Sequence, residues 1–349
     1  MSTYRAAVIG SGGRSGPHIK AYKHIDRGEV VACADLVLEK AEKRAAEFGL
    51  KAYADSAEMI KAEKPDLVHI CTPPTARADL LTLCSDLGVP ACTIEKPLAT
   101  GVRDWRELCS LESSTKTKIA ICHQCRWQEN LVKCQGALKS GKLGEVKFLE
   151  FSAGMNISGQ GTHILNYGMS LNGDSPVVCV FGAASGDSEM NSVHPAPDTT
   201  IGYLVFENGV RALWNNGATA PWTCGDPNVS YQHVRAAAYA DKGRVLWEEF
   251  GGWEIISPDG EERGRIASLD ERAAKNIRAQ AAFHEAVLDW LEDDGKPPGT
   301  NFKQSLHEWK VVLALYASAV ERRPIELADF DPPGDLFDRL ATVVAQAKG

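Results

Sequence analysis

The first 120 residues alternate short apolar runs with amphipathic stretches, and this alternation constrains the fold more than any other feature of the chain. Apolar residues at helical spacing between short β-rich runs predict helices that connect parallel strands. Because such crossovers are right-handed, the pattern predicts a doubly wound parallel sheet of the Rossmann type. The predicted strands are 6–9, 30–34, 67–71, 89–94 and 118–122, and the predicted helices are 18–24, 38–48, 56–62, 76–87 and 102–113.

After residue 122 the strands become longer and follow one another through tight turns. The segments Glu207-Asn208-Gly209 and Asp241-Lys242-Gly243 are typical of hairpin turns, so this part predicts a large, mostly antiparallel open sheet. Long helices are predicted at 129–140, 273–291 and 302–321. We therefore expect an α/β protein with a Rossmann domain over 1–122 and an α+β domain over 123–349, whose tail wraps the surface or packs back on the first domain.

The bulk composition argues against several classes of protein. A net charge of -8 without a dense basic run opposes binding to nucleic acid. No uncharged apolar run approaches the roughly 18 to 20 residues that cross a bilayer, and the amino terminus lacks the pattern of a signal peptide. The sequence therefore predicts a cytoplasmic protein that has neither a nucleic acid nor a membrane as its partner.

The ten cysteines do not form a convincing metal site. Cys122 and Cys125 make a single Cys-x-x-Cys pair without a second pair at zinc spacing, so no metal is predicted. Most of the cysteines stand among small apolar residues and are expected to be buried thiols. This applies to Cys33, Cys71, Cys92, Cys122 and Cys179.

A glycine-rich loop follows the first predicted strand and precedes a helix. In this context glycines permit a tight turn and allow the backbone to approach a pyrophosphate. The third glycine of the usual fingerprint is replaced by a serine, and a glycine follows one place later. The loop residues expected to bind a dinucleotide are Gly10, Ser11, Gly12, Gly13, Arg14 and Ser15.

Asp35 ends the second strand, about 20 residues after the glycine loop, where a carboxylate can accept hydrogen bonds from an adenosine ribose. Leu36 and Val37 follow it, so no adjacent cation is present to neutralise a 2′-phosphate. NAD is therefore favoured over NADP. The alternative is a glycine turn followed by a solvated aspartate.

Two further motifs stand at the predicted carboxyl ends of strands, where doubly wound folds bind ligands. They are Thr72-Pro73-Pro74 and Glu95-Lys96-Pro97. Together with the glycine loop, with Gly141-Lys142-Leu143-Gly144 and with Gly161-Thr162-His163, they resemble the Gfo/Idh/MocA family of glucose-fructose oxidoreductases and inositol dehydrogenases. The resemblance implies an NAD-binding Rossmann domain in which Thr72, Pro73, Pro74, Glu95 and Lys96 bind the cofactor. It also implies a substrate domain whose open sheet often forms a dimer interface, hence a homodimer or homotetramer.

The resemblance also implies two catalytic residues, Lys96 and His163. An ammonium beside the reacting hydroxyl stabilises a developing alkoxide, and a histidine can take or give its proton. Lys96 could otherwise be a solvated lysine, and His163 a structural histidine. Gly159 and Asn166 replace the carboxylates that the family usually carries on either side of this histidine, so His163 is either a weaker base or is only held in place by Asn166.

Several other residues are candidates for substrate binding. His123 and Arg126 follow the last strand of the Rossmann pattern, near the positions where the family contacts nicotinamide and substrate. Trp222, His233 and Arg235 belong to a segment that mixes aromatic rings with polar groups, as sugar sites do. The alternative for this segment is sheet core, including Trp214 and Tyr231, and a solvated loop. Arg77, at a position where the family commonly has histidine, is expected to be a solvated helix residue.

The expected activity is NAD-dependent oxidation or reduction of a secondary alcohol or ketone in a sugar, a sugar derivative or a cyclitol. A second hypothesis is an NAD-dependent glycosidase that acts by transient oxidation at C3, elimination, hydration and re-reduction. A third is an NAD-binding sensor without catalysis, which predicts that removing Lys96 leaves every activity unchanged.

Overall fold

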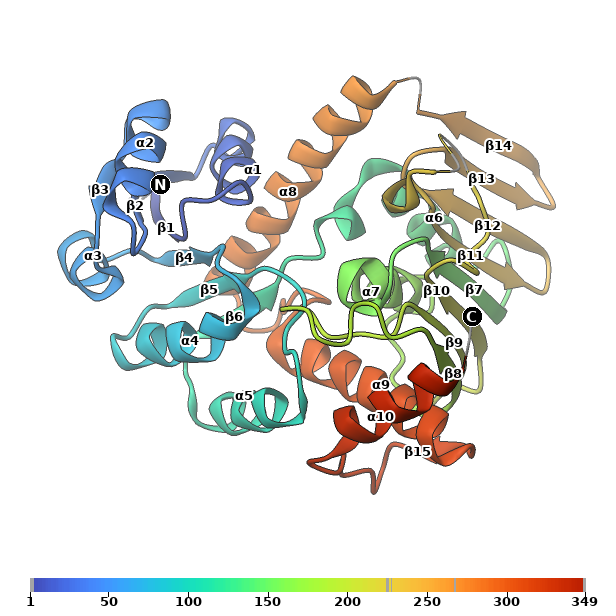
Figure 1. The fold of residues 1–349 in the computed structure, drawn as a ribbon. Coiled ribbons are helices and arrows are strands. Elements are labelled where there is room, and N and C mark those ends of the chain that lie inside the picture. Colours follow the sequence, from blue (N-terminus) through green and yellow to red (C-terminus); the bar gives the residue numbers. More distant parts are fainter. Residues whose placement is uncertain (1–2, 224–225, 227, 267, 348–349) are drawn as a thin grey trace. The chain divides into compact units, whose positions relative to one another are not determined.

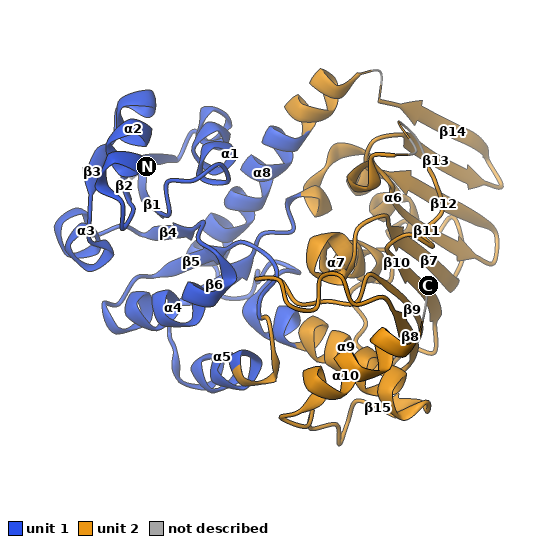
Figure 2. Cartoon of the chain, viewed as in Figure 1, with its two compact units in different colours: residues 1–99, 104–124, 276–306 blue, residues 100–103, 125–275, 307–349 orange. Residues whose placement is uncertain are grey.

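The computed structural model describes residues 3–223, 226, 228–266 and 268–347. These residues form two compact units (Figure 2). Unit 1 contains residues 1–99, 104–124 and 276–306, and unit 2 contains residues 100–103, 125–275 and 307–349. The predicted domains over 1–122 and 123–349 therefore differ from the compact units mainly in one segment, because 276–306 packs with the Rossmann sheet.

Unit 1 is built on a six-stranded parallel sheet with the order β3-β2-β1-β4-β5-β6, which confirms the doubly wound prediction (Figure 1). The structure adds one strand that the sequence did not predict, the three-residue edge strand β3. The strands are β1 Tyr4–Ile9, β2 Gly28–Ala34, β3 Lys51–Tyr53, β4 Leu67–Ile70, β5 Ala91–Ile94 and β6 Lys118–Ile121. The helices between them are α1 Ser15–Ala21, α2 Leu38–Phe48, α3 Ser56–Glu63, α4 Arg77–Asp86 and α5 Val102–Ser114.

Unit 2 contains a nine-stranded sheet with the order β14-β13-β12-β11-β7-β10-β9-β8-β15. The pairs are antiparallel except β7 with β10, so the prediction of a mostly antiparallel sheet is confirmed. The strands are β7 Val146–Ala153, β8 Val177–Ser185, β9 Thr199–Phe206, β10 Arg211–Asn216, β11 Val234–Ala240, β12 Gly243–Glu248, β13 Gly252–Ser257, β14 Gly260–Arg265 and β15 Ile325–Glu326.

Helices cover one face of this sheet. Helix α9 Phe302–Glu321 lies directly on β8 and β9, because Gly182 and Gly202 leave room for Leu315: a Cβ at either glycine would stand 2.7 Å from that side chain. The tail ends in a helix as predicted, α10 Leu336–Gln346, which packs on β8 within unit 2. The helices after α5 are α6 Glu129–Lys139, α7 Thr162–Ser170, α8 Leu269–Glu292, α9 Phe302–Glu321 and α10 Leu336–Gln346, and most of α8 belongs to unit 1.

The opposite face of the sheet carries a row of exposed apolar side chains. Phe181, Tyr203 and Leu213 are cross-strand neighbours on β8, β9 and β10, and they are 48%, 37% and 43% exposed. Ile201 lies beside this row and is 44% exposed. Contiguous exposed apolar groups of this kind mark a surface suited to association.

Two further expectations concern burial. Cys33, Cys92 and Cys122 are buried thiols as predicted, whereas Cys71 and Cys179 are partly exposed. In the described residues, no helix combines the length and the apolar character that a membrane span requires.

Candidate active site

The glycine loop joins β1 to α1 in unit 1, and its geometry requires glycine at the first position. Gly10 has φ of 92°, and a Cβ there would stand 2.9 Å from the carbonyl oxygen of Cys71. A Cβ at Gly12 or Gly13 would meet nothing within 4 Å, so the loop has open space beside it. Ser15, which stands in place of the third glycine, donates its hydroxyl to the carbonyl of Gly12 at 2.6 Å.

The hydrogen bonds that the loop makes, and those that it leaves unmade, fit the binding of a dinucleotide. Asp35 accepts the Ser11 N–H at 2.8 Å through Oδ2 and the Val37 N–H at 3.0 Å through Oδ1. The hydroxyls of Ser11 and Thr72 are buried without a hydrogen-bond partner, and the Cγ2 atom of Thr72 would stand 3.0 Å from a Cβ at Gly10. Buried hydroxyls rarely remain unsatisfied, so this loop offers hydrogen bonds to a ligand. Such orphaned groups would suit the oxygen atoms of NAD.

Arg44 is a neighbour of the loop that the sequence did not single out. Its Nη2 donates to the carbonyl of Gly12 at 2.9 Å, and its Nη1 pairs with Glu47 at 2.7 Å. It lies on α2, nine residues after Asp35, so adjacency in the sequence could not identify it.

Glu95 and Lys96 follow β5 at the carboxyl edge of the sheet, and the Lys96-Pro97 peptide bond is cis. Glu95 is 5% exposed, and its Oε1 accepts hydrogen bonds from Arg14 at 2.7 Å and from His18 at 2.9 Å. Although burial alone would raise the pKa of Glu95, His18 and Arg14 hold it well below its usual range. Burial lowers the pKa of Lys96, and the negative charge of Glu95 opposes that change.

Arg77 corrects one prediction, because it is buried and not solvated. It is 3% exposed, and it donates to the carbonyl of Thr72 at 3.0 Å and to the carbonyl of Pro97. The single side chain therefore ties the Thr72-Pro73-Pro74 turn to the segment after Lys96. Burial lowers the pKa of this guanidinium to about 10.

A group of buried imidazoles lies next to Glu95 and was not predicted. His18 Nδ1 lies 3.1 Å from His284 Nε2, and the ring of His284 stacks on that of His69 with centroids 4.2 Å apart. Burial lowers the pKa of His69 and of His284 well below the ordinary value, so both rings are neutral at pH 7. His69 uses both ring nitrogens for Tyr22 and Thr93. His18, His69 and His284 are close enough to hold a metal ion, but both ring nitrogens of His69 are engaged in hydrogen bonds, whereas Nδ1 of His284 is buried without a hydrogen-bond partner.

His163 and Asn166 lie one turn apart on α7 in unit 2. Tyr167 Oη is 3.3 Å from His163 Nδ1. Asn166 is fully buried and donates its amide to Glu308 Oε1 at 2.6 Å. Arg126 Nη1 lies 3.4 Å from Asn166 Oδ1, and its Nη2 forms an ion pair with Asp174. The structure therefore brings together two predicted residues, Arg126 and Asn166. It adds Glu308 and Asp174, which the sequence did not indicate.

The other predicted substrate residues are not gathered around α7 to the same extent. Trp222 is 65% exposed. His233 is buried and has an unpartnered Nε2, whereas Arg235 lies 3.7 Å from Glu150. The alternative prediction of a sheet-core residue is confirmed for Trp214, which is fully buried. Tyr231, in contrast, is 47% exposed and packs on Phe250. In unit 1, His123 is buried directly after β6.

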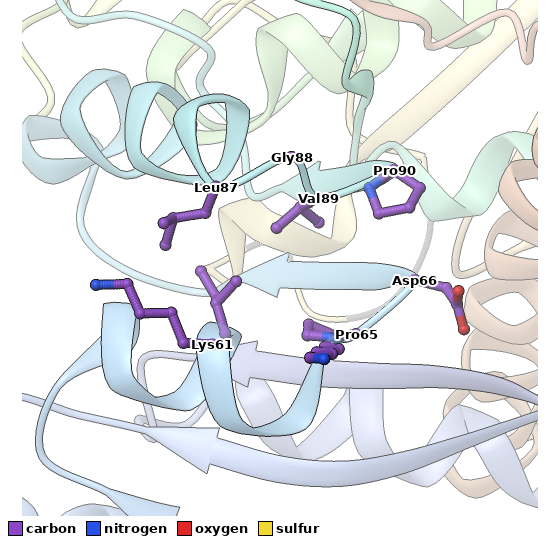
Figure 3. Close-up of a pocket in the computed structure, with 9 residues that line it drawn as sticks. Lys61, Pro65, Asp66, Leu87, Gly88, Val89 and Pro90 are labelled. Carbon is purple, nitrogen blue, oxygen red and sulfur yellow. The ribbon is translucent and has the colours of Figure 1, made fainter.

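The structure also contains a hollow of about 480 Å³ in unit 1 (Figure 3). It lies at the amino ends of β4 and β5, between Lys61, Pro65 and Asp66 on one side and Leu87 and Pro90 on the other. Ligands of doubly wound sheets bind at the carboxyl ends of the strands, so this hollow is not the cofactor site.

Comparison with known proteins agrees with this geometry. Residues 4–123 match the family model of Gfo/Idh/MocA oxidoreductases, described as an oxidoreductase family with an NAD-binding Rossmann fold. D-apiose dehydrogenase of Paraburkholderia graminis is 25% identical over 95% of this chain and 92% of its own length. D-glucoside 3-dehydrogenase of Escherichia coli is 26% identical over 93% and 98%.

The fold of the whole chain is also found among solved structures. An oxidoreductase from Agrobacterium radiobacter, solved with NAD+, L-tartaric acid and magnesium, superposes with a TM-score of 0.78 at 18% identity, over 93% of this chain and 99% of that one. Its fold extends the similarity beyond the residues matched by the family model. Residues 4–123 thus match an oxidoreductase family with an NAD-binding Rossmann fold, the Gfo/Idh/MocA family that the motifs resemble.

Proposed function

We propose that this chain is an NAD-dependent dehydrogenase acting on a secondary alcohol or ketone of a sugar, a sugar derivative or a cyclitol. The observation that carries the proposal is Lys96, which stands at the carboxyl end of β5 beside the buried carboxylate of Glu95 and has a lowered pKa. The names of the two full-length relatives, D-apiose dehydrogenase and D-glucoside 3-dehydrogenase, support a carbohydrate as the substrate.

Bound NAD would supply the hydride acceptor, and the chain's own residues would manage the proton. The lowered pKa of Lys96 makes its free amine accessible, and the amine would accept the proton of the substrate hydroxyl when the hydride leaves to NAD. The ammonium formed in this way would stabilise negative charge on the substrate oxygen and would then release the proton to water. The charge of Glu95 keeps Lys96 from losing its proton too early, because it raises the pKa that burial lowers. Arg14 donates a hydrogen bond to the carboxylate of Glu95 and so connects the glycine loop to the residue that precedes Lys96.

In unit 2 we propose that His163, Asn166 and Arg126 bind the substrate. In the tautomer whose Nδ1–H donates to Tyr167 Oη, Nε2 of His163 is the proton acceptor. Trp222, His233 and Arg235 remain proposed contacts for the outer part of the substrate.

The test is an NADH absorbance assay against free sugars, cyclitols, sugar acids and aryl glycosides, after mass spectrometry of the protein purified without added cofactor. Lys96→Met should lower kcat by roughly 10² to 10⁴ while NAD still binds. Lys61→Met, on the exposed surface of α3, is the matched control and should behave as the unmodified protein. Release of an aglycone without accumulation of NADH would favour the glycosidase hypothesis, and full activity of Lys96→Met would oppose the proposal.

We also propose that the chain forms a homodimer or homotetramer through the exposed apolar face of the nine-stranded sheet. The row of Phe181, Tyr203 and Leu213 supports this, because exposed apolar side chains on three adjacent strands gain stability when a second copy covers them.

A further inference from the structure

Tyr231 presents an exposed aromatic ring in unit 2 that the proposed function does not use. The ring is 47% exposed, and it meets the ring of Phe250 edge to face, with centroids 5.6 Å apart. The guanidinium of Arg272 covers Phe250 at 4.1 Å from the ring centroid and is paired with the buried Glu249. We call these four residues the Tyr231 platform. A half-exposed ring with such support offers a fixed surface on which another ring can stack.

The platform is attached close to His163. Gly154, directly after β7, allows this, because a Cβ there would stand 3.1 Å from the Cβ of His233, two residues after Tyr231. Gln160 donates its side-chain amide to the carbonyl of Tyr231 at 2.8 Å. Gln160 precedes His163 by three residues of helical backbone, which is roughly one turn, about 5 Å. The platform is therefore tied to the chain one turn before the proposed proton acceptor.

Two buried polar atoms beside the platform, both in described residues, lack a hydrogen-bond partner. They are Oε1 of Gln160 and Nε2 of His233. The N–H of Thr223 donates to Nδ1 of His233 at 3.5 Å, so the ring proton is on Nε2, which is a donor. The amide nitrogen of Gln160 is used for Tyr231, so its oxygen is a free acceptor. Buried polar atoms are normally satisfied, and hydroxyl groups, which both accept and donate, suit this pair.

The exposure of the platform decides which part of a substrate it can hold. A reacting ring has to be enclosed, because water is excluded from the place where the hydride leaves. Tyr231 keeps nearly half of its surface in solvent, and Trp222, nine residues earlier in the chain, is 65% exposed. Rings as open as these do not enclose a ligand. They suit a ring that stays near the surface while its neighbour reaches His163.

We propose that the Tyr231 platform, together with Gln160 and His233, is a subsite for the second ring of a glycoside. The substrate is then a sugar whose C1 oxygen carries another ring, either a second sugar or an aryl group, and not a free sugar. Tyr231 stacks on the apolar face of that ring, and Gln160 and His233 bind its hydroxyl groups where it is a sugar. This rests on the proposed function, in which His163 marks the place of the reacting ring.

The first test measures kcat/KM in the NADH assay for the phenyl and methyl β-glycosides of D-glucose, D-galactose and D-xylose. The two glycosides of each sugar differ only in the second ring. The unmodified protein should prefer the phenyl glycoside about tenfold. Tyr231→Ala should lose most of this preference, and Tyr231→Phe should keep it because the ring is retained. Tyr239→Ala, at the opposite end of β11, is the matched control and should also keep it.

The preference is a ratio measured within one variant, so a loss of folded protein cancels from it. An equal preference in Tyr231→Ala and the unmodified protein would overturn the proposal. So would a higher kcat/KM for the free sugar than for its phenyl glycoside.

The second test separates the polar pair from the stacking ring. The disaccharides cellobiose, lactose and xylobiose carry hydroxyl groups on the second ring, whereas the matching phenyl glycosides carry none there. His233→Asn places its amide where Nδ1 was and removes the Nε2 donor, so it should lower kcat/KM for the disaccharide relative to the phenyl glycoside about tenfold. His233→Gln keeps a donor at the position of Nε2 and should keep the ratio. An unchanged ratio in His233→Asn would overturn the subsite as proposed.

A binding measurement needs no turnover and separates this proposal from the proposed function. Titration calorimetry of the full chain with added NAD should detect one of the three phenyl glycosides. Its affinity should fall about tenfold in Tyr231→Ala and stay level in Tyr231→Phe. Absence of binding, or equal affinity in Tyr231→Ala, overturns the subsite even if dehydrogenase activity is found. Full activity of Lys96→Met overturns the proposed function even if the platform binds the glycoside.

Discussion

Truncating Glu95 to alanine should cost about 3 kcal/mol of the free energy of unfolding, and the structure shows how this figure arises. One carboxylate oxygen accepts hydrogen bonds from both Arg14 and His18. Bonds to a charged group contribute roughly 1.5–3 kcal/mol each. The side chain of Arg14 is 44% exposed, so water replaces much of its lost bond, and its share is small.

His18 contributes the larger share. Its side chain is 1% exposed, so without Glu95 the Nε2 donor is buried and unsatisfied, at a cost of about 1–3 kcal/mol. Adding the discounted bond from Arg14 gives the total of about 3 kcal/mol. Glu95→Gln keeps an acceptor oxygen of the same size and should therefore lose only about half as much.

The pH dependence has a definite sign. The pKa of Glu95 is lower in the folded protein than in the unfolded chain, so its stabilising effect is present above the ordinary carboxyl pKa and is lost as the pH falls below that value. Urea denaturation at pH 7 should therefore show the full difference between Glu95→Ala and the unmodified protein, and denaturation at pH 3 a smaller one. Glu42→Ala, on the exposed face of α2, is the matched control.

The same substitution reports on Lys96. Removing the neighbouring negative charge should lower the pKa of Lys96 further, so the pH profile of kcat for Glu95→Gln should move toward lower pH. A loss of less than about 1 kcal/mol in Glu95→Ala, or a profile that moves toward higher pH in Glu95→Gln, would refute the reasoning.

Three further predictions concern other parts of the chain. Asp35→Ser should weaken NAD binding at least tenfold in a fluorescence titration, and raise the relative preference for NADP, because the carboxylate that anchors Ser11 and Val37 is removed; unchanged NAD affinity would contradict this. Tyr203→Glu should dissociate the proposed oligomer in light-scattering measurements, because it places a charge at the centre of the exposed apolar row; an unchanged mass would exclude this face. The pKa of Glu308 is raised to about 8, so its stabilising effect is complete below the ordinary carboxyl pKa and is lost as the pH rises toward 8. Relative to Glu308→Gln, the unmodified protein should lose about 4 kcal/mol of unfolding free energy between pH 5 and pH 8. Parallel stability curves of the two proteins would show that the pKa of Glu308 is not raised.

The sequence predicted the parts of the fold that depend on local patterns. The alternation of strands and helices predicted the parallel sheet, and the glycine loop with Asp35 predicted the cofactor. Both predictions depend on residues that are close together in the chain. The edge strand Lys51–Tyr53 was missed because three residues are too few to show an alternation.

What the sequence could not supply are contacts made across the fold. Arg77 looked solvated because its two carbonyl acceptors follow different strands and meet only in the folded sheet. His284 and Glu308 stand on long amphipathic helices, far in sequence from His18 and Asn166, and a single polar residue on an apolar helical face gives no signal of its partner. A search for isolated polar residues on the buried faces of helices could have marked both as candidates.

The division of unit 1 into three segments has a consequence for how the protein is made. Its sheet is complete once Gln124 has been synthesised, but the segment that brings Gln280 and His284 ends at Leu306, about 180 residues later. At roughly 5–20 residues per second, the ribosome takes about 10 to 40 seconds to deliver it. During that interval His18 and Cys122 lack their hydrogen-bond partners on α8, so the polar side chains that α8 covers in the finished protein are exposed to water. A fragment that stops at residue 124 would lack α8 permanently, which makes it a poor choice for producing the cofactor domain alone.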